Sequence, residues 1–175
     1  MDKIVIENTL KEDIVNFSLP RYSKLTGASL FLEQTVELIN SWLKPLGVIE
    51  LTSSMVSNYV KQRIIPSPIK KQYGQEQLAY LFFVAIAKTV APLEDIKMMI
   101  DMQKQTYSVQ EAYDYLCKEL ENVLQYIFGN KDCLEEVGET NSELKELLRN
   151  MIITIAHKIH FVKYLELVKS QMIGE

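Results

Sequence analysis

The chain has 175 residues, a length that fits one domain of ordinary size, or a small domain plus an appended helical segment, and excludes a large multidomain enzyme. Hydrophobic residues make up 47% of it and charged residues 24%, with only 6 Gly and 5 Pro, which excludes a disordered or linker-rich chain. The formal net charge of −4 excludes a surface that attracts polyanions as a whole, so a nucleic acid would need a local basic patch.

The first half of the chain predicts three helices. Thr9 and Glu12 have the spacing of a capping box, which predicts a short helix over residues 10–17. Apolar side chains at helical spacing predict a second helix over residues 28–44, namely Leu32, Val36, Ile39 and Leu43. Residues 51–64 begin with hydroxyl side chains that can cap a helix, and their apolar positions share one face: Val56, Tyr59, Val60 and Ile64.

The segment 65–74 cannot be helical, because Pro66 and Pro68 remove backbone donors and favour extended geometry in the residues before them. We predict a short strand, a turn and a second strand there. A helix, a turn, a helix and a small β-hairpin wing are the plan of a winged helix-turn-helix.

Three further helices are predicted after this segment. Residues 75–90 are apolar nearly all round and predict a central core helix. Residues 92–105 begin with Pro92, and Ser108 with Glu111 makes a capping box before a helix to about residue 128. The last helix, over residues 140–172, has apolar side chains beyond a single stripe, and we expect these additional side chains to be buried against another surface. The predicted fold is therefore mostly α, with a winged helix-turn-helix domain at 1–105 and a C-terminal helical region at 106–175.

Basic charge is concentrated in one segment. Residues 51–75 contain Lys61, Arg63, Lys70 and Lys71 and no acidic residue, whereas residues 106–175 hold 12 of the 23 acidic residues. Exposed charges are screened beyond roughly 8 Å at physiological salt, so a phosphate on this segment would respond to its local charge.

The side chains of this segment predict roles on double-stranded DNA. Asn58 and Gln62 carry amides that can pair with adenine, and Lys61 can reach guanine or a phosphate. Serines can serve either purpose, and the wing lysines would hold phosphates. Tyr73 fits a phosphate contact or packing in the hairpin. The predicted DNA-binding set is Ser54, Ser57, Asn58, Lys61, Gln62, Arg63, Lys70, Lys71 and Tyr73.

Two family resemblances rest on these residues. The stretches 58–66, 71–73, 77–78 and 93–97 resemble the N-terminal DNA-binding domain of MerR-type regulators, although Ser57-Asn58-Tyr59-Val60 stands where those proteins usually have Arg-Tyr-Tyr-Glu. The run 51–61, with Pro66, Pro68, Lys70, Lys71 and Tyr73, is similar over residues 18–105 to an uncharacterised family of small bacterial proteins that share a domain of unknown function. The resemblances imply a winged-helix fold and a bacterial origin, and the first implies transcription regulation.

Other readings stay open. The same surface fits a helical adaptor that binds a protein and no DNA, and the apolar excess of residues 144–165 favours a homodimer. The tyrosines and Phe128 of residues 107–128 fit an effector pocket or ordinary helix packing.

No catalytic, metal or cofactor motif is visible. His157 and His160 lack a carboxylate partner at helical spacing, and Cys117 and Cys133 form no CxxC. The longest apolar run, residues 78–87, is short of the roughly 20 residues that span a bilayer. We therefore expect a cytoplasmic protein that is not an enzyme and has free thiols, no cofactor and no membrane segment.

Overall fold

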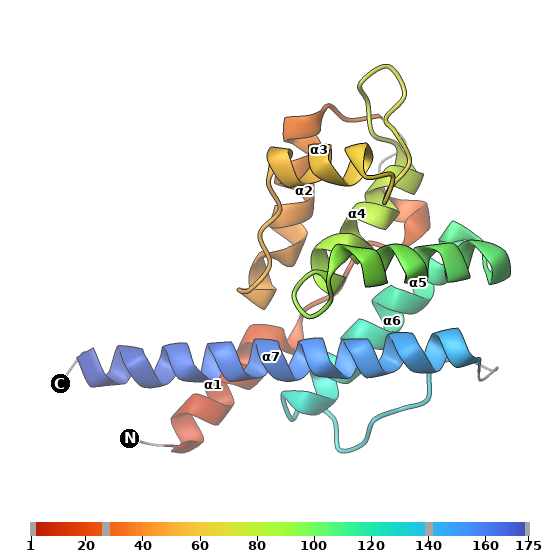
Figure 1. The fold of residues 1–175 in the computed structure, drawn as a ribbon. Helices are drawn as coiled ribbons and strands as arrows, with labels where there is room; N and C mark the ends of the chain where they lie inside the picture. The colour runs from red at the N-terminus through yellow and green to blue at the C-terminus, as the bar shows by residue number, and fades with distance from the viewer. Residues whose placement is uncertain (1–2, 26–28, 139–141, 174–175) are drawn as a thin grey trace.

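The computed structural model describes residues 3–25, 29–138 and 142–173, and these residues are mostly helical (Figure 1). The described residues form seven α-helices and two short 3-10 turns, and they contain no β-strand. The helices are α1 (Lys3–Val15), α2 (Leu32–Leu43), α3 (Ser53–Lys61), α4 (Gln75–Ala87), α5 (Leu93–Thr106), α6 (Val109–Ile127) and α7 (Glu143–Ile173), and the turns are η1 (Tyr22–Lys24) and η2 (Lys44–Leu46). The prediction of a mostly α fold is confirmed.

Helix α4 forms the centre of the hydrophobic core. Ten of its 13 residues are buried, as expected for a helix that is apolar nearly all round, and it packs against α2, α5, α6 and α7. The same core cluster extends from Ile6 on α1 to Ile159 on α7. Residues on both sides of position 105 thus share one core, and the division at 105 stays a prediction.

Helix α1 begins earlier than predicted. Its buried residues Ile6, Leu10 and Ile14 recur every four positions, so one stripe along its whole length packs on α6 and α7. Thr9 lies inside the helix, where its Oγ1 donates to the carbonyl oxygen of Val5 at 2.9 Å. The predicted capping box at Thr9 was therefore wrong.

Helix α6 begins at the predicted capping box. Glu111 N donates to Ser108 Oγ at 3.2 Å, and Ser108 N donates to Glu111 Oε2 at 2.9 Å. Ser108 Oγ also donates to Glu111 Oε2 at 2.6 Å, and this bond, together with the one from Ser108 N, lowers the pKa of Glu111. Gly129, with a φ of +76°, stands just after the helix end, where a left-handed residue favours glycine.

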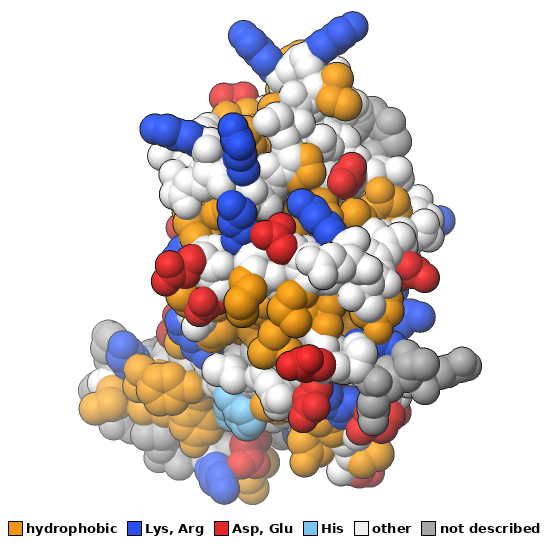
Figure 2. Space-filling model, turned by 45° about the vertical axis from the view of Figure 1, so that its right-hand side comes forward, with side chains coloured by type: hydrophobic (Ala, Val, Ile, Leu, Met, Phe, Trp, Pro, Cys, Tyr) orange, Lys and Arg blue, Asp and Glu red, His pale blue; other side chains and the backbone are white. Residues whose placement is uncertain are grey.

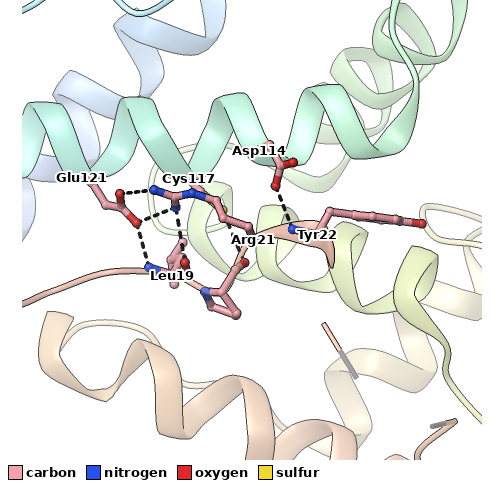
Figure 3. A network of polar contacts seen from close by, with 7 residues as sticks. Leu19, Arg21, Tyr22, Asp114, Cys117 and Glu121 are labelled. Atoms are coloured by element: carbon pink, nitrogen blue, oxygen red, sulfur yellow. Dashed lines mark hydrogen bonds and ion pairs between the residues drawn. The ribbon is translucent and has the colours of Figure 1, made fainter. Parts of the chain in front are cut away.

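A polar network fastens the segment between α1 and α2 to α6 (Figure 3). Arg21 Nη1 and Nη2 donate to Glu121 Oε1 and Oε2 at 2.7 and 2.6 Å, which is the strong bidentate form of an ion pair. Leu19 N donates to the same Glu121 at 2.9 Å, and Tyr22 N donates to Asp114 Oδ1 at 2.7 Å. These bonds set the starting position of the chain that leads into α2 and α3.

No helix in the described ranges is long and apolar enough to cross a membrane.

Candidate nucleic-acid interface

Helix α3 is held against α2 by a side chain that the sequence analysis did not single out. Asn40 on α2 donates through Nδ2 to the carbonyl oxygen of Leu51 and accepts at Oδ1 from Leu51 N, both at 2.8 Å. Gly47 turns the chain between the helices with a φ of +75°, a value that glycine adopts at little cost. Thr52 then caps α3 by accepting from Met55 N at 3.2 Å. The helix, turn and helix thus follow from local hydrogen bonds.

The outward face of α3 carries the predicted polar residues. Val56 and Tyr59 are buried beneath it, so the opposite side faces solvent. Gln62 Nε2 donates to Asn58 Oδ1 at 3.0 Å, which places the two amides side by side as their spacing predicts. The exposed predicted residues on and beside this helix are Ser54, Ser57, Asn58, Lys61, Gln62 and Arg63.

The predicted β-hairpin wing was wrong. The segment between α3 and α4 is a loop, residues 62–74, in which the bridge between Ile69 and Gln72 closes a two-residue turn. Ile69 N donates to Gln72 O at 3.0 Å, and Gln72 N donates to Ile69 O at 2.9 Å. The next hydrogen-bonded pair of a hairpin would be Ser67 with Gly74, but Gly74 N donates to Gln77 Oε1 and Ser67 O accepts from Gln77 Nε2, so the pairing does not extend into strands. Tyr73 bridges to Leu30 instead.

Basic residues of this segment occupy left-handed backbone positions. Lys70 and Lys71 form the tip of the turn with φ values of +50° and +65°, and Arg63 has a φ of +56°. Positive φ at both central residues is the signature of a type I′ turn, which favours Asn-Gly. The left-handed conformation costs an ordinary L-residue roughly 1–2 kcal/mol. The turn therefore holds its two cations at a conformational cost.

Tyr73 is the one predicted site residue that lies inside the protein. It is 4% exposed, and burial raises the pKa of its hydroxyl. Its N donates to Leu30 O at 2.8 Å, and its O accepts from Leu30 N at 3.0 Å. Tyr73 supports the loop from within, and its ring is not part of the exposed face.

The loop is also fastened to α4 by Gln77, which is buried. Gln77 Nε2 donates to Ser67 O at 3.3 Å, and its Oε1 accepts from Gly74 N at 3.0 Å. Asn40 and Gln77 are the two supporting residues that the sequence analysis missed. The signal that would have found them is a polar amide beside buried apolar neighbours, because a buried amide needs hydrogen-bond partners.

The remaining predicted residues form one surface, which we call the α3–loop face: Ser54, Ser57, Asn58, Lys61, Gln62, Arg63, Lys70 and Lys71, all exposed. In Figure 1 both α3 and the loop lie at the upper end of the molecule, and Figure 2 shows Lys and Arg side chains projecting there. The segment 51–75 has four Lys and Arg residues and no acidic residue, so its own formal charge is positive although that of the whole chain is negative.

The histidines and cysteines lie elsewhere. His160 packs between the rings of Phe128 and Tyr164, with centroids 5.0 and 6.2 Å away, and burial lowers its pKa, aided by the nearby His157. Cys117 is buried, which raises its pKa to about 12, whereas Cys133 is exposed. Within the described part of the chain, no three His, Cys, Asp or Glu residues are grouped to hold a metal ion.

Comparison with known proteins identifies one family. The profile of a family described as "Domain of unknown function (DUF1836)" matches residues 19–116. This range begins beside Arg21 and includes the whole α3–loop face. No curated protein and no solved structure matches the chain. The comparisons give no support to the resemblance to MerR-type regulators.

Proposed function

The chain belongs to the DUF1836 family, and we propose that it is a DNA-binding transcription regulator that places the α3–loop face on double-stranded DNA. Helix α3 enters the major groove, as the second helix of a helix-turn-helix does. Asn58 and Gln62 pair with adenine edges, while Lys61 reaches guanine or a phosphate. Arg63, Lys70 and Lys71 bind phosphates beside the groove, which adds affinity without sequence preference.

The observation that carries this proposal is the pair of lysines at the tip of the loop. Their φ values of +50° and +65° are ones in which Asn and Gly are more stable. Keeping two ammonium groups there costs stability, and strained backbone of this kind clusters at functional sites. The loop carries the cations toward solvent, where they can reach the phosphates that flank a groove.

A homodimer fits this function, because a single nine-residue recognition helix contacts little DNA. A dimer on a two-fold symmetric site doubles the number of contacted base pairs. Helix α7 supplies a surface for the second copy. Phe161, Leu165 and Met172 on α7 are 64%, 37% and 69% exposed. Phe161 and Leu165 lie at the end of the stretch 144–165 that has the apolar excess, and Met172 lies beyond it. Packing these side chains on their copies would remove them from water.

One observation favours the alternative, a helical adaptor. Ile69 stands beside the two lysines at the loop tip and is 74% exposed. A DNA phosphate makes no use of this apolar side chain, whereas a protein partner would cover it. The two functions therefore differ in whether binding depends on Ile69 or on the lysines.

Fluorescence anisotropy of labelled mixed genomic DNA fragments, measured across a salt series, tests the proposal. We expect wild-type protein to bind with a log-log salt slope of about −0.9 for each phosphate contact. Lys70→Glu/Lys71→Glu should lose affinity and slope, while Ile69→Ser should keep both.

The matched control is Lys97→Glu/Lys118→Glu, which makes the same charge change at exposed positions of α5 and α6, away from the α3–loop face and from the apolar stripe of α7. If it weakens binding as much as the loop variant does, the effect belongs to net charge and not to the α3–loop face. If wild-type protein fails to bind DNA at low salt, the adaptor replaces the regulator as the working hypothesis.

A further inference from the structure

A cavity of about 570 Å³ opens between α4, α5, α6 and the first turns of α7, at the side of the molecule where the C-terminal end of α5 and the starts of α6 and α7 come together (Figure 1). Its volume is in the range of sites that hold small molecules. The cavity lies apart from the α3–loop face, none of whose residues lines it.

The cavity wall is mainly apolar and aromatic. Phe83 comes from α4, Met99 from α5 and Leu148 from α7, and the rings of Tyr107 and Tyr115 both lie near the Lys145 ammonium. The tyrosine-rich stretch 107–128, which the sequence left open between an effector pocket and helix packing, thus contributes to a cavity wall. Tyr126 of the same stretch is 42% exposed, and Phe128 packs on His160.

The wall polar groups are mostly engaged with the protein itself. Gln103 Oε1 accepts from Tyr80 Oη at 3.2 Å, and its Nε2 donates to Tyr107 O at 2.6 Å. Of the two acids at the rim, Glu111 caps α6 and Asp114 accepts from Tyr22 N. The wall that an incoming molecule meets is therefore mainly apolar and aromatic.

The cavity lining includes two lysines, Lys118 and Lys145, and Lys145 is the one that lies over tyrosine rings. Its Nζ is 5.7 Å from the ring centroid of Tyr107 and 5.2 Å from that of Tyr115, which is cation–π range. A flat ring that enters between the apolar walls can pack on tyrosine side chains of the lining, and an acid group on that ring would lie within reach of Lys145.

We propose that this cavity binds a small aromatic carboxylate, with its ring against the apolar and tyrosine walls and its carboxylate on Lys145. The site does not depend on the DNA-binding function, because it is built from a different part of the chain.

Isothermal titration calorimetry with 2-naphthoate, in the absence of DNA, tests this site. We expect wild-type protein to bind one molecule per chain. Lys145→Gln should weaken binding at least fivefold, and the neutral analogue 2-naphthamide should bind wild-type protein at least fivefold more weakly than the acid. Ala112→Phe, which adds a ring to the cavity wall, should abolish binding. Lys169→Gln, an exposed position farther along α7, is the matched control and should bind as wild type does.

Thermal unfolding of each variant shows whether it is folded. A folded Ala112→Phe variant that binds 2-naphthoate like wild type would place the ligand elsewhere, and absence of binding to wild type at millimolar 2-naphthoate would overturn the site. Equal affinity for acid and amide would overturn the role of Lys145 and the choice of ligand class. Since no DNA is present, these results are independent of whether the α3–loop face binds DNA.

Discussion

Replacing the loop tip by the sequence that its backbone prefers should stabilise the protein and weaken its DNA binding. The change is Lys70→Asn/Lys71→Gly, which installs the Asn-Gly pair favoured by a type I′ turn. Relief of two left-handed L-residues is worth roughly 1–2 kcal/mol each when complete. Asn relieves only part of this cost. Gly relieves its own cost in the folded state, but it also lowers stability by about 0.4–1 kcal/mol because it increases the conformational entropy of the unfolded chain. The net gain is about 1 kcal/mol.

Urea denaturation and thermal melting measure this gain. For a chain of this size, about 1 kcal/mol corresponds to a rise in Tm of roughly 2–4 °C. The same variant removes two ammonium groups, so the DNA salt slope should shrink by about 1.8 if each lysine contacts one phosphate. Lys70→Arg/Lys71→Arg keeps the charge and the backbone cost and should change neither quantity. A variant with Asn-Gly that is less stable than wild type would refute the argument from backbone cost, and an unchanged salt slope would refute the phosphate contacts.

Three predictions concern the rest of the molecule. Arg21→Ala leaves the partly buried Glu121 carboxylate without its bidentate partner and should lower the free energy of unfolding by about 2 kcal/mol. Lys131→Ala removes a more exposed ion pair with Glu135 and should lower it by under about 0.5 kcal/mol. Equal losses for the two variants in urea denaturation would contradict this prediction. Native protein should react with one equivalent of a thiol reagent, at Cys133, and denatured protein with two, because Cys117 is buried. Burial raises the pKa of Glu119, so the contribution of this carboxyl group to stability is full below its pKa in the unfolded chain and is lost as pH rises through its pKa in the folded protein. Glu119→Gln should therefore be more stable than wild type at pH 8, by about 1 kcal/mol, with a smaller difference at pH 4. A stability advantage of the variant that does not grow with pH would contradict this prediction.

The helices were predictable where one local pattern decides them. Helical spacing of apolar residues located α2, and a run that is apolar nearly all round located α4. The capping box at Ser108 located the start of α6 within a residue. At α1 the same kind of box misled, because Thr9 and Glu12 have the right spacing while Ile6 continues the buried stripe into the turn before them. A packing stripe outweighs a single cap.

The sequence predicted which residues of the candidate interface are exposed. It did not predict the contacts that hold the loop in place. Asn58 and Gln62 share a face because helical spacing requires it. The loop depends on Leu30, which pairs with Tyr73 across more than 40 positions, and such a distant bridge leaves no local pattern. The turn itself has no glycine or asparagine at its tip, so its two-residue length could not be recognised from turn chemistry.

Helix α4 connects the two proposed sites within a few turns. It starts at Gln75, directly after the loop, and Gln77 in its first turn fastens Ser67 and Gly74. Tyr80 and Phe83 follow on the same helix and line the cavity, one and two turns later. Because a buried helix is closely packed, it moves as a unit and not by bending at each residue. A carboxylate that shifts α4 by contact with Phe83 would shift the anchor of the loop as well, so DNA affinity measured with and without 2-naphthoate should differ for wild-type protein and agree for Ala112→Phe.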